Sequence, residues 1–188
     1  TGQDCRSEEC LRLIESLLHE GCFLQQFDSP GLRTLYPAIE EEAFGYSYGM
    51  HKPGVRDVNR VFLANLLLDV ANQCDRGHYL EVGTYQGNFA RIIWNRMDKK
   101  AILYCFDTFE GFDPHDTQIE KQETGMVVKA GHYADTSLEQ VARTICGEEF
   151  GDRLRLIKGH FPESFRDITD QLFRFVHLDA DLYEPTRE

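Results

Sequence analysis

The chain has 188 residues, of which 41% are apolar and 12% aromatic, enough for one α/β domain with its own core and a helical extension. Its 32 acidic and 20 basic residues give a net charge of −12, and no Lys/Arg-rich run is present. This balance argues against nucleic acid as a partner, because such a surface needs clustered cations, and it favours a protein that handles small molecules.

The sequence shows no sign of a membrane or secretory segment. Its first ten residues, TGQDCRSEEC, are polar and acidic, unlike a signal peptide, and its most apolar helical stretch, residues 61–71, is too short to span a bilayer. The six cysteines, at positions 5, 10, 22, 74, 105 and 146, include no C-x-x-C pair. We therefore expect no disulfide framework or zinc site, and a reducing, cytoplasmic setting.

The N-terminal third predicts helices and an irregular region. Apolar residues recur at helical spacing over residues 7–27, and Asp28-Ser29-Pro30-Gly31 ends that helix. An aromatic, Gly-rich segment, residues 46–54, follows as either a lid over a ligand or a mobile linker. Asp57 is predicted to cap a helix that runs to about residue 74. We expect residues 1–56 to form a helical extension and residues 57–188 a separate domain.

From residue 78 onward, apolar strands alternate with helices. The strands are predicted over residues 78–83, 101–107, 153–159 and 173–181, and the helices over 88–97, 136–146 and 162–170, with a loop of about two dozen residues after Asp107. This order predicts a Rossmann-like parallel sheet with helices on both faces. The chain stops just after the fourth strand, so we expect part of the natural domain to be missing. The open edge would favour a homo-oligomer.

Acidic residues and glycines gather where the first two strands end. The stretch YLEVGTYQG carries Glu81, Gly83 and Gly87 in an E-x-G-x-x-x-G pattern, which differs from the dinucleotide fingerprint G-x-G-x-x-G. Ligands of open parallel sheets bind at this edge, and a carboxylate there suits an amine-bearing ligand. Asp107, at the end of the second strand, is placed to accept hydrogen bonds from ribose hydroxyls. The alternatives are a packing turn for the glycines and a cap for Asp107.

Two more carboxylates follow in FVHLDADLYEPT, at the end of the fourth strand. Asp179 and Asp181 are two residues apart, so on a strand they would point into one cleft. Solubility at a strand end and capping of a following helix is the alternative. His177 alternates with Asp179 and points either into the site or into packing. His115 and His132 lie in the long loop, where they would contact a substrate.

These motifs are similar to those of class I S-adenosylmethionine-dependent methyltransferases. YLEVGTYQG resembles the first motif of the catechol O-methyltransferase type. FVHLDADLYEPT resembles the fourth-strand motif of the macrocin O-methyltransferase group, which modifies sugars on macrolide antibiotics, and YCFDTFEGF and KGHFPESF fit the same group. The resemblance covers roughly residues 57–186. Relatives of this kind use N-terminal elements over the acceptor, which is where a lid of residues 46–54 would lie.

The resemblance implies a role for each matching residue. Glu81, Gly83 and Thr84 would hold the amino-acid end of S-adenosylmethionine, Tyr85 would lie near its sulfonium, and Gly87 would let the next helix approach closely. Asp107 would bind the ribose, and the adenine pocket would be lined by Gly159, His160 and Phe161. Asp179 would be one ligand of a Mg²⁺ ion, and Asp181 a second acid or general base. The remaining metal ligands of such enzymes follow a fifth strand, which this sequence lacks.

The sequence therefore predicts an O-methyltransferase that acts on a hydroxyl of a sugar or small natural product, assisted by a divalent metal. Two other hypotheses remain open at this point. One is a non-catalytic or truncated module that only binds a ligand or partner. The other is an NAD-dependent oxidoreductase, against which the glycine spacing argues.

Overall fold

The computed structural model describes residues 41–42, 55–148, 151–182 and 185–186. The predicted helix over residues 7–27 and the predicted lid or linker over residues 46–54 lie outside these described residues. The chain divides into two compact units, Thr1–Val70 and Ala71–Glu188.

The described part of the first unit is dominated by helix α4, Val55–Ala71, whose last residue belongs to the second unit. Asp57 is its third residue rather than its N-cap, so the predicted cap position is wrong, and the helix ends three residues before the predicted end at Cys74. Asn65 is buried and donates a hydrogen bond from Nδ2 to Glu42 Oε2 at 2.7 Å. No helix in the described part of the chain has the length and apolarity that crossing a membrane would require.

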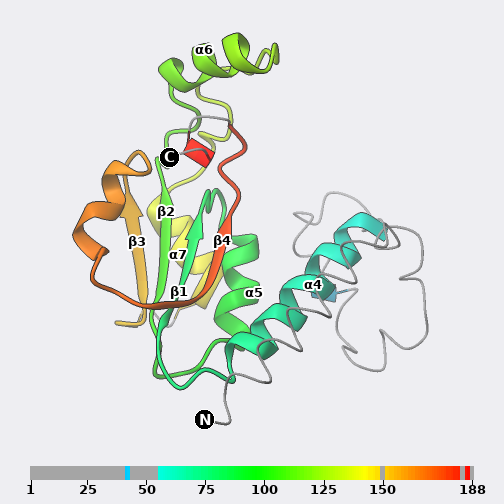
Figure 1. Ribbon diagram of the computed structural model, residues 1–188, viewed down its shortest axis with the longest axis vertical. Helices are drawn as coiled ribbons and strands as arrows, with labels where there is room; N and C mark the ends of the chain where they lie inside the picture. Colours follow the sequence, from blue (N-terminus) through cyan, green and yellow to red (C-terminus); the bar gives the residue numbers. More distant parts are fainter. Residues whose placement is uncertain (1–40, 43–54, 149–150, 183–184, 187–188) are drawn as a thin grey trace. The chain divides into compact units, whose positions relative to one another are not determined.

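The second unit is built on a four-stranded sheet in the order β3-β2-β1-β4. Its strands are β1 (His78–Val82), β2 (Leu103–Asp107), β3 (Leu154–Lys158) and β4 (Phe173–Leu178). All three strand pairings are parallel, which confirms the predicted Rossmann-like α/β architecture. Parallel neighbours need crossover connections, and the alternating helices provide them (Figure 1).

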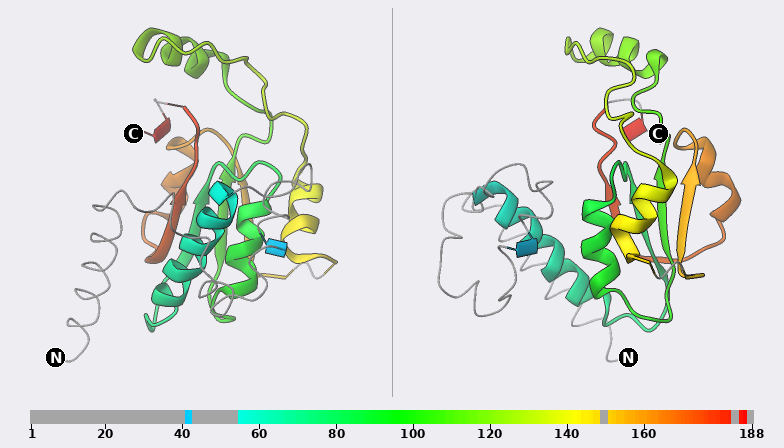
Figure 2. Two further views of the ribbon diagram at one scale, coloured as in Figure 1. Left: turned by 90° about the vertical axis from the view of Figure 1, so that its right-hand side faces the viewer. Right: turned by 180° about the vertical axis from the view of Figure 1, so that it is seen from behind.

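Two helices cover one face of this sheet. Helices α5 (Asn88–Arg96) and α7 (Leu138–Cys146) lie side by side there, as the view from behind shows (Figure 2). Their buried residues are Ala90, Ile92, Ile93, Val141, Ala142 and Ile145. Ser137, one residue after the predicted helix start, caps α7 by accepting a hydrogen bond from the Gln140 N–H at 3.3 Å.

The opposite face carries an aromatic core. Leu80, Val82, Tyr104 and Phe106 alternate out of β1 and β2 onto this face, and they contact Phe161, Phe165 and Ile168 around the 3₁₀ helix η2 (Glu163–Ile168). The predicted helix over residues 162–170 is thus a shorter 3₁₀ helix. Val176 and Leu178, on β4 opposite Leu80 and Val82, are about half exposed, at 50% and 55%.

The loop predicted after β2 contains a helix that the periodicity did not indicate. Helix α6, Pro114–Glu123, lies beyond the carboxyl ends of the strands (Figure 1). Asp113 caps it by accepting the His115 N–H at 2.7 Å, and Pro114 occupies its first turn. An Asp-Pro pair is a helix-start signal that was available in the sequence, but α6 has only a weak apolar stripe.

Candidate active site

The turn after β1 is held between the ends of β2 and β4. The Gly83 N–H donates to the Phe106 carbonyl, and the Asp179 N–H donates to the Val82 carbonyl, each at 2.9 Å. Gly83 has φ +83°, and a Cβ there would lie 2.0 Å from the Asp179 carbonyl oxygen. Only glycine fits at this position, because both the backbone conformation and the neighbouring strand exclude a side chain. Thr84 is buried directly after it.

Asp107 joins the loops that follow β1 and β2. Its Oδ2 accepts the Tyr85 N–H and its Oδ1 accepts the Phe109 N–H, both at 2.7 Å. A carboxylate oxygen has more than one lone pair, so each can still accept a hydroxyl hydrogen from a ligand. The sequence placed Asp107 at the end of β2 but did not reveal the hydrogen bond to Tyr85, since that depends on strand pairing.

Glu81 is a buried acid near the carboxyl end of β1. The strand register places it between Cys105 of β2 and His177 of β4, and its side chain is 1% exposed. Oε1 lies 3.2 Å from His177 Nδ1, while Oε2 has no hydrogen-bond partner among the described residues. Burial raises the pKa of Glu81, and this outweighs the lowering by His177 and Thr84. A buried oxygen without a partner makes Glu81 a candidate acceptor for a ligand's donor group.

Gly87 lies where α5 packs against α7. It has φ +84°, and a Cβ there would lie 2.9 Å from Ile145 Cγ1 and 3.2 Å from Val141 Cγ1. The glycine thus accommodates a helix contact, the role that the family resemblance implied for it.

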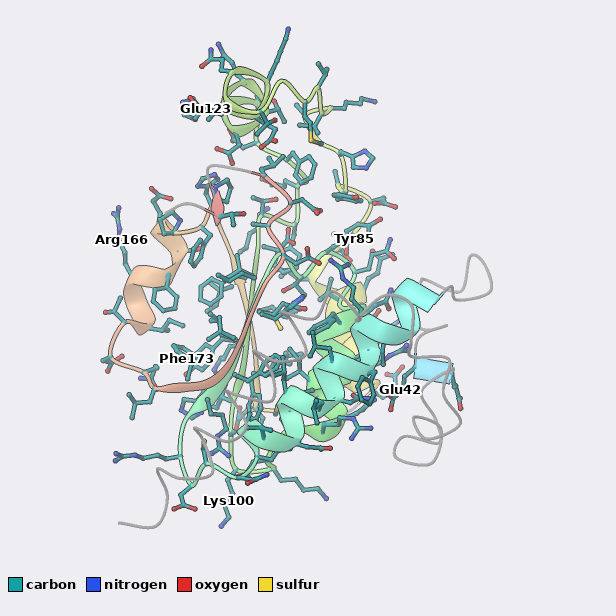
Figure 3. The ribbon with its side chains drawn as sticks, turned by 45° about the vertical axis from the view of Figure 1, so that its right-hand side comes forward. Glu42, Tyr85, Lys100, Glu123, Arg166 and Phe173 are labelled. Atoms are coloured by element: carbon teal, nitrogen blue, oxygen red, sulfur yellow. The ribbon has the colours of Figure 1, made fainter. Side chains whose placement is uncertain are left out.

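Tyr85 extends outward from the turn after β1, at the edge of the sheet opposite Lys100 (Figure 3). Its hydroxyl donates to Asp135 Oδ1 at 2.8 Å and its ring lies 4.8 Å from that of Tyr133. Burial, with the hydrogen bond to Asp135 second, raises the pKa of Tyr85 to about 12. A pocket of about 420 Å³ adjoins these groups and contains none of the predicted site residues. Its lining residues are Gln86, Asp135, Thr136, Gln140, Arg143 and Thr144.

The three residues predicted around adenine have different surroundings. The Gly159 N–H donates to the Asp107 carbonyl at 3.0 Å, so this loop lies beside the end of β2. Phe161 packs edge-on against Phe106 in the core, at a centroid distance of 6.3 Å. His160 is partly exposed and pairs with two acids.

The His160 ring is held by carboxylates on both sides. Nε2 lies 2.6 Å from Asp116 Oδ2 on α6, and Nδ1 lies 3.1 Å from Glu163 Oε2. Burial lowers the pKa of His160, but the hydrogen bonds to Asp116 and Glu163 outweigh it and raise that pKa overall. The histidine therefore links α6 to the loop after β3.

The two acids after β4 are separated by a change in backbone conformation. The strand ends at Leu178, so Asp179 and Asp181 follow it, and Asp181 has φ +60°. The prediction that the strand extends to residue 181 is wrong, and strand alternation therefore does not align these side chains. Asp179 is half-buried and Asp181 is exposed. Both carboxylates interact electrostatically with Tyr133. Burial is the largest cause of the raised pKa of Tyr133, and the charges of Asp181 and Asp179 raise it further.

The other two histidines of the long loop differ in their surroundings. His132 forms a cluster with the rings of Phe112 and Tyr133, at centroid distances of 6.0 Å and 4.2 Å, and those two rings lie 5.3 Å from each other. His115 is exposed on α6, with Nδ1 3.9 Å from Asp116 Oδ1. Among the residues that the structure describes, no three His, Cys, Asp or Glu side chains are grouped so as to hold a metal ion.

A parallel sheet in the order β3-β2-β1-β4 with a glycine turn between two acidic strand ends is consistent with a Rossmann-like methyltransferase fold. Residues 80–188 match the model of the family described as methyltransferase domain, and the chain belongs to that family. Membership implies S-adenosylmethionine as the methyl donor.

Five solved chains match the fold. One of them, titled "Crystal Structure of CalS11, Calicheamicin Methyltransferase", is 17% identical with a TM-score of 0.49, and the match covers 78% of this chain and 69% of that one. No curated protein matches the sequence.

Proposed function

We propose that the chain catalyses transfer of a methyl group from S-adenosylmethionine to a hydroxyl of a sugar or another small natural product. The observation that carries the proposal is the pair of acids at the ends of β1 and β2, with the Gly83 turn between them. Glu81 offers an unpartnered carboxylate oxygen, and Asp107 stands one strand away with its carboxylate fixed by two backbone N–H groups. The similarity of FVHLDADLYEPT to the macrocin O-methyltransferase group supports a hydroxyl acceptor.

The donor would lie across the carboxyl edge of the sheet. Glu81 would accept hydrogen bonds from the donor's ammonium group, since a buried carboxylate is stabilised by a cation. Asp107 would accept hydrogen bonds from the ribose hydroxyls. Gly83 and Thr84 would contact the amino-acid end, and Tyr85 the region of the sulfonium. Gly159, His160 and Phe161 would lie on the adenine side.

S-Adenosylmethionine supplies an electrophilic methyl carbon, which is transferred by in-line displacement. The sulfur–carbon bond breaks as the acceptor oxygen forms its bond to carbon, and the hydroxyl proton must leave to a base. Asp179 and Asp181 lie beside β1 and β4 at the same edge of the sheet, so either carboxylate would take up this proton. Their charges and the Tyr133 hydroxyl would together orient the acceptor.

Assistance by Mg²⁺ is a separate part of the proposal, and it rests on the family resemblance. A carboxylate such as that of Asp179 is a suitable Mg²⁺ ligand. The described residues do not complete a group of three ligands around it, so no step of the reaction is assigned to a metal. Methyl transfer measured with added Mg²⁺ and with a chelator would decide this part, because a metal-assisted enzyme loses turnover in the chelator while donor binding remains.

Donor binding is tested by calorimetry with S-adenosylhomocysteine, which has the donor's contact groups but no transferable methyl. We expect micromolar affinity, weakened roughly tenfold or more in Asp107→Ala, because hydrogen bonds to a charged group are lost. Since Asp107 also holds the Tyr85 and Phe109 N–H groups, the matched control is the 2′-deoxy analogue of the ligand. The unmodified chain should discriminate against that analogue, and Asp107→Ala should not.

The outcomes separate this proposal from its alternatives. Absence of S-adenosylhomocysteine binding would refute the donor site, and binding of NAD in its place would favour the oxidoreductase. Binding of S-adenosylmethionine without turnover on any hydroxylated acceptor, with or without Mg²⁺, would favour a binding module. Equal weakening of the ribose and deoxyribose ligands in Asp107→Ala would assign Asp107 to loop structure alone.

A further inference from the structure

His177 and Glu81 form a buried pair that crosses from β4 to β1. Parallel pairing places the two residues directly opposite each other, and the ring nitrogen Nδ1 lies 3.2 Å from Glu81 Oε1. The histidine side chain is 21% exposed and that of the glutamate 1%. On its other side the imidazole stacks on Phe89 of α5, with ring centroids 3.6 Å apart and planes inclined by 14°. The ring is thus held in one orientation.

The chemistry of the pair decides which nitrogen carries a proton. In its ionised state, the state that would pair with an ammonium group, the Glu81 carboxylate only accepts hydrogen bonds, so Nδ1–H then donates to Oε1. This bond uses one carboxylate oxygen and leaves the other, Oε2, without a partner among the described residues. The stacked histidine therefore fixes which Glu81 oxygen is available to a ligand.

We infer that His177 is a positioning residue for donor binding: it orients Glu81 so that Oε2 accepts the ammonium group of the methyl donor. The inference rests on the proposed function, and it adds a residue that the sequence motifs do not assign to the site. Because His177 contacts Glu81 and no contact with the donor is required of it, its effect should be confined to the amino-acid end of the ligand.

The charges around Glu81 make this role sensitive to pH. Burial raises the pKa of Glu81. The neighbouring His177 and Thr84 lower that pKa, and the negative charge of Asp179 raises it. On the β2 side Cys105 is neutral, since burial keeps the pKa of its thiol well above the ordinary value, and Phe89 from α5 is uncharged. Without His177, Glu81 would stay protonated to a higher pH. A protonated carboxyl group cannot form an ion pair with an ammonium group.

Two variants separate hydrogen bonding from packing. His177→Phe keeps an aromatic ring for Phe89 and removes the donor to Glu81, whereas His177→Asn loses the ring but places an amide N–H near the position of Nδ1. Two ligands separate the ends of the donor: S-adenosylhomocysteine has the ammonium group, and 5′-methylthioadenosine lacks the amino-acid end. Affinities are measured by calorimetry from pH 5.5 to 8.5, with thermal unfolding and circular dichroism confirming that each variant is folded.

We expect His177→Phe to bind S-adenosylhomocysteine about tenfold or more weakly and 5′-methylthioadenosine normally, and His177→Asn to recover most of the loss. As the pH falls, affinity for S-adenosylhomocysteine should be lost at a higher pH in His177→Phe than in the unmodified chain. Equal effects of His177→Phe on both ligands, or an unshifted pH profile, would overturn the inference. If the unmodified chain binds 5′-methylthioadenosine and S-adenosylhomocysteine equally well, Glu81 does not hold the ammonium. If it binds neither, the proposed function itself fails.

Discussion

The turn after β1 makes a quantitative prediction for the substitution Gly83→Ala. A left-handed backbone costs an L-residue about 1–2 kcal/mol. In addition, the new Cβ would lie 2.0 Å from the carbonyl oxygen and 2.6 Å from the carbonyl carbon of Asp179, so the backbone after β4 would have to move. Overpacking of this kind typically costs a further 1–3 kcal/mol or so. We expect the free energy of unfolding to fall by about 2–5 kcal/mol.

Two matched glycines isolate the effect of the neighbouring strand. Gly125 has φ +76°, and no atom lies within 4 Å of the position that a Cβ would occupy there, so Gly125→Ala should cost only the conformational term of about 1–2 kcal/mol. Gly87 has φ +84° and faces the flexible side chain of Ile145 at 2.9 Å, so Gly87→Ala should be intermediate. The order of destabilisation should be Gly83, then Gly87, then Gly125.

The assay is urea unfolding followed by circular dichroism, supported by thermal unfolding, in which 1 kcal/mol corresponds to about 2–4 °C for a chain of this size. Gly83→Ala should also lose S-adenosylhomocysteine binding, because its turn lies in the candidate donor site. The reasoning would be refuted if Gly83→Ala and Gly125→Ala were destabilised to the same extent, since the close approach of Asp179 would then have no energetic consequence.

Three further predictions concern other contacts of the second unit. Burial lowers the pKa of His160, but its carboxylate partners raise that pKa more, so the net shift is upward from 6.5. The protonated histidine therefore stabilises the folded state below pH 6.5, and this stabilisation is lost as the pH rises through the folded-state pKa. Urea midpoints of Asp116→Asn across pH 5–8 should therefore lose part of this dependence; an unchanged profile would contradict the pairing. Burial raises the pKa of the Cys105 thiol, so a thiol reagent should label exposed Cys74 in the folded protein and Cys105 only after unfolding, as peptide mass spectrometry would show. Arg174→Lys should lower the free energy of unfolding by about 1 kcal/mol, because Nε of the nearly buried guanidinium donates to the Gly77 carbonyl at 2.9 Å and lysine cannot reproduce its geometry. A neutral effect in urea unfolding would show that this contact is dispensable.

Local patterns in the sequence predicted most of the sheet. Apolar runs of β length alternate with helical periodicity from residue 78 onward, and this order favours parallel strands with crossover helices whatever the rest of the chain does. The glycine turn after β1 and the acid that ends β2 could also be predicted from the sequence, because a tight turn and a strand end depend on residues that are neighbours along the chain. Helix α6 was missed because its apolar periodicity is weak, although Asp113-Pro114 marks its start.

Contacts between distant segments came only from the folded structure. Gly83 meets the Asp179 carbonyl because β4 pairs with β1, and Glu81 meets His177 through the same pairing across 96 positions of sequence. Asp179 and Asp181, predicted to lie in the fourth strand, fall outside it because β4 ends at Leu178, and Asp181 adopts a left-handed backbone with φ +60°. Strand pairing sets these distances through long-range packing, whereas composition and periodicity describe only neighbours along the chain. The types of residue in the candidate site were therefore predictable from sequence, and their mutual geometry was a consequence of the fold.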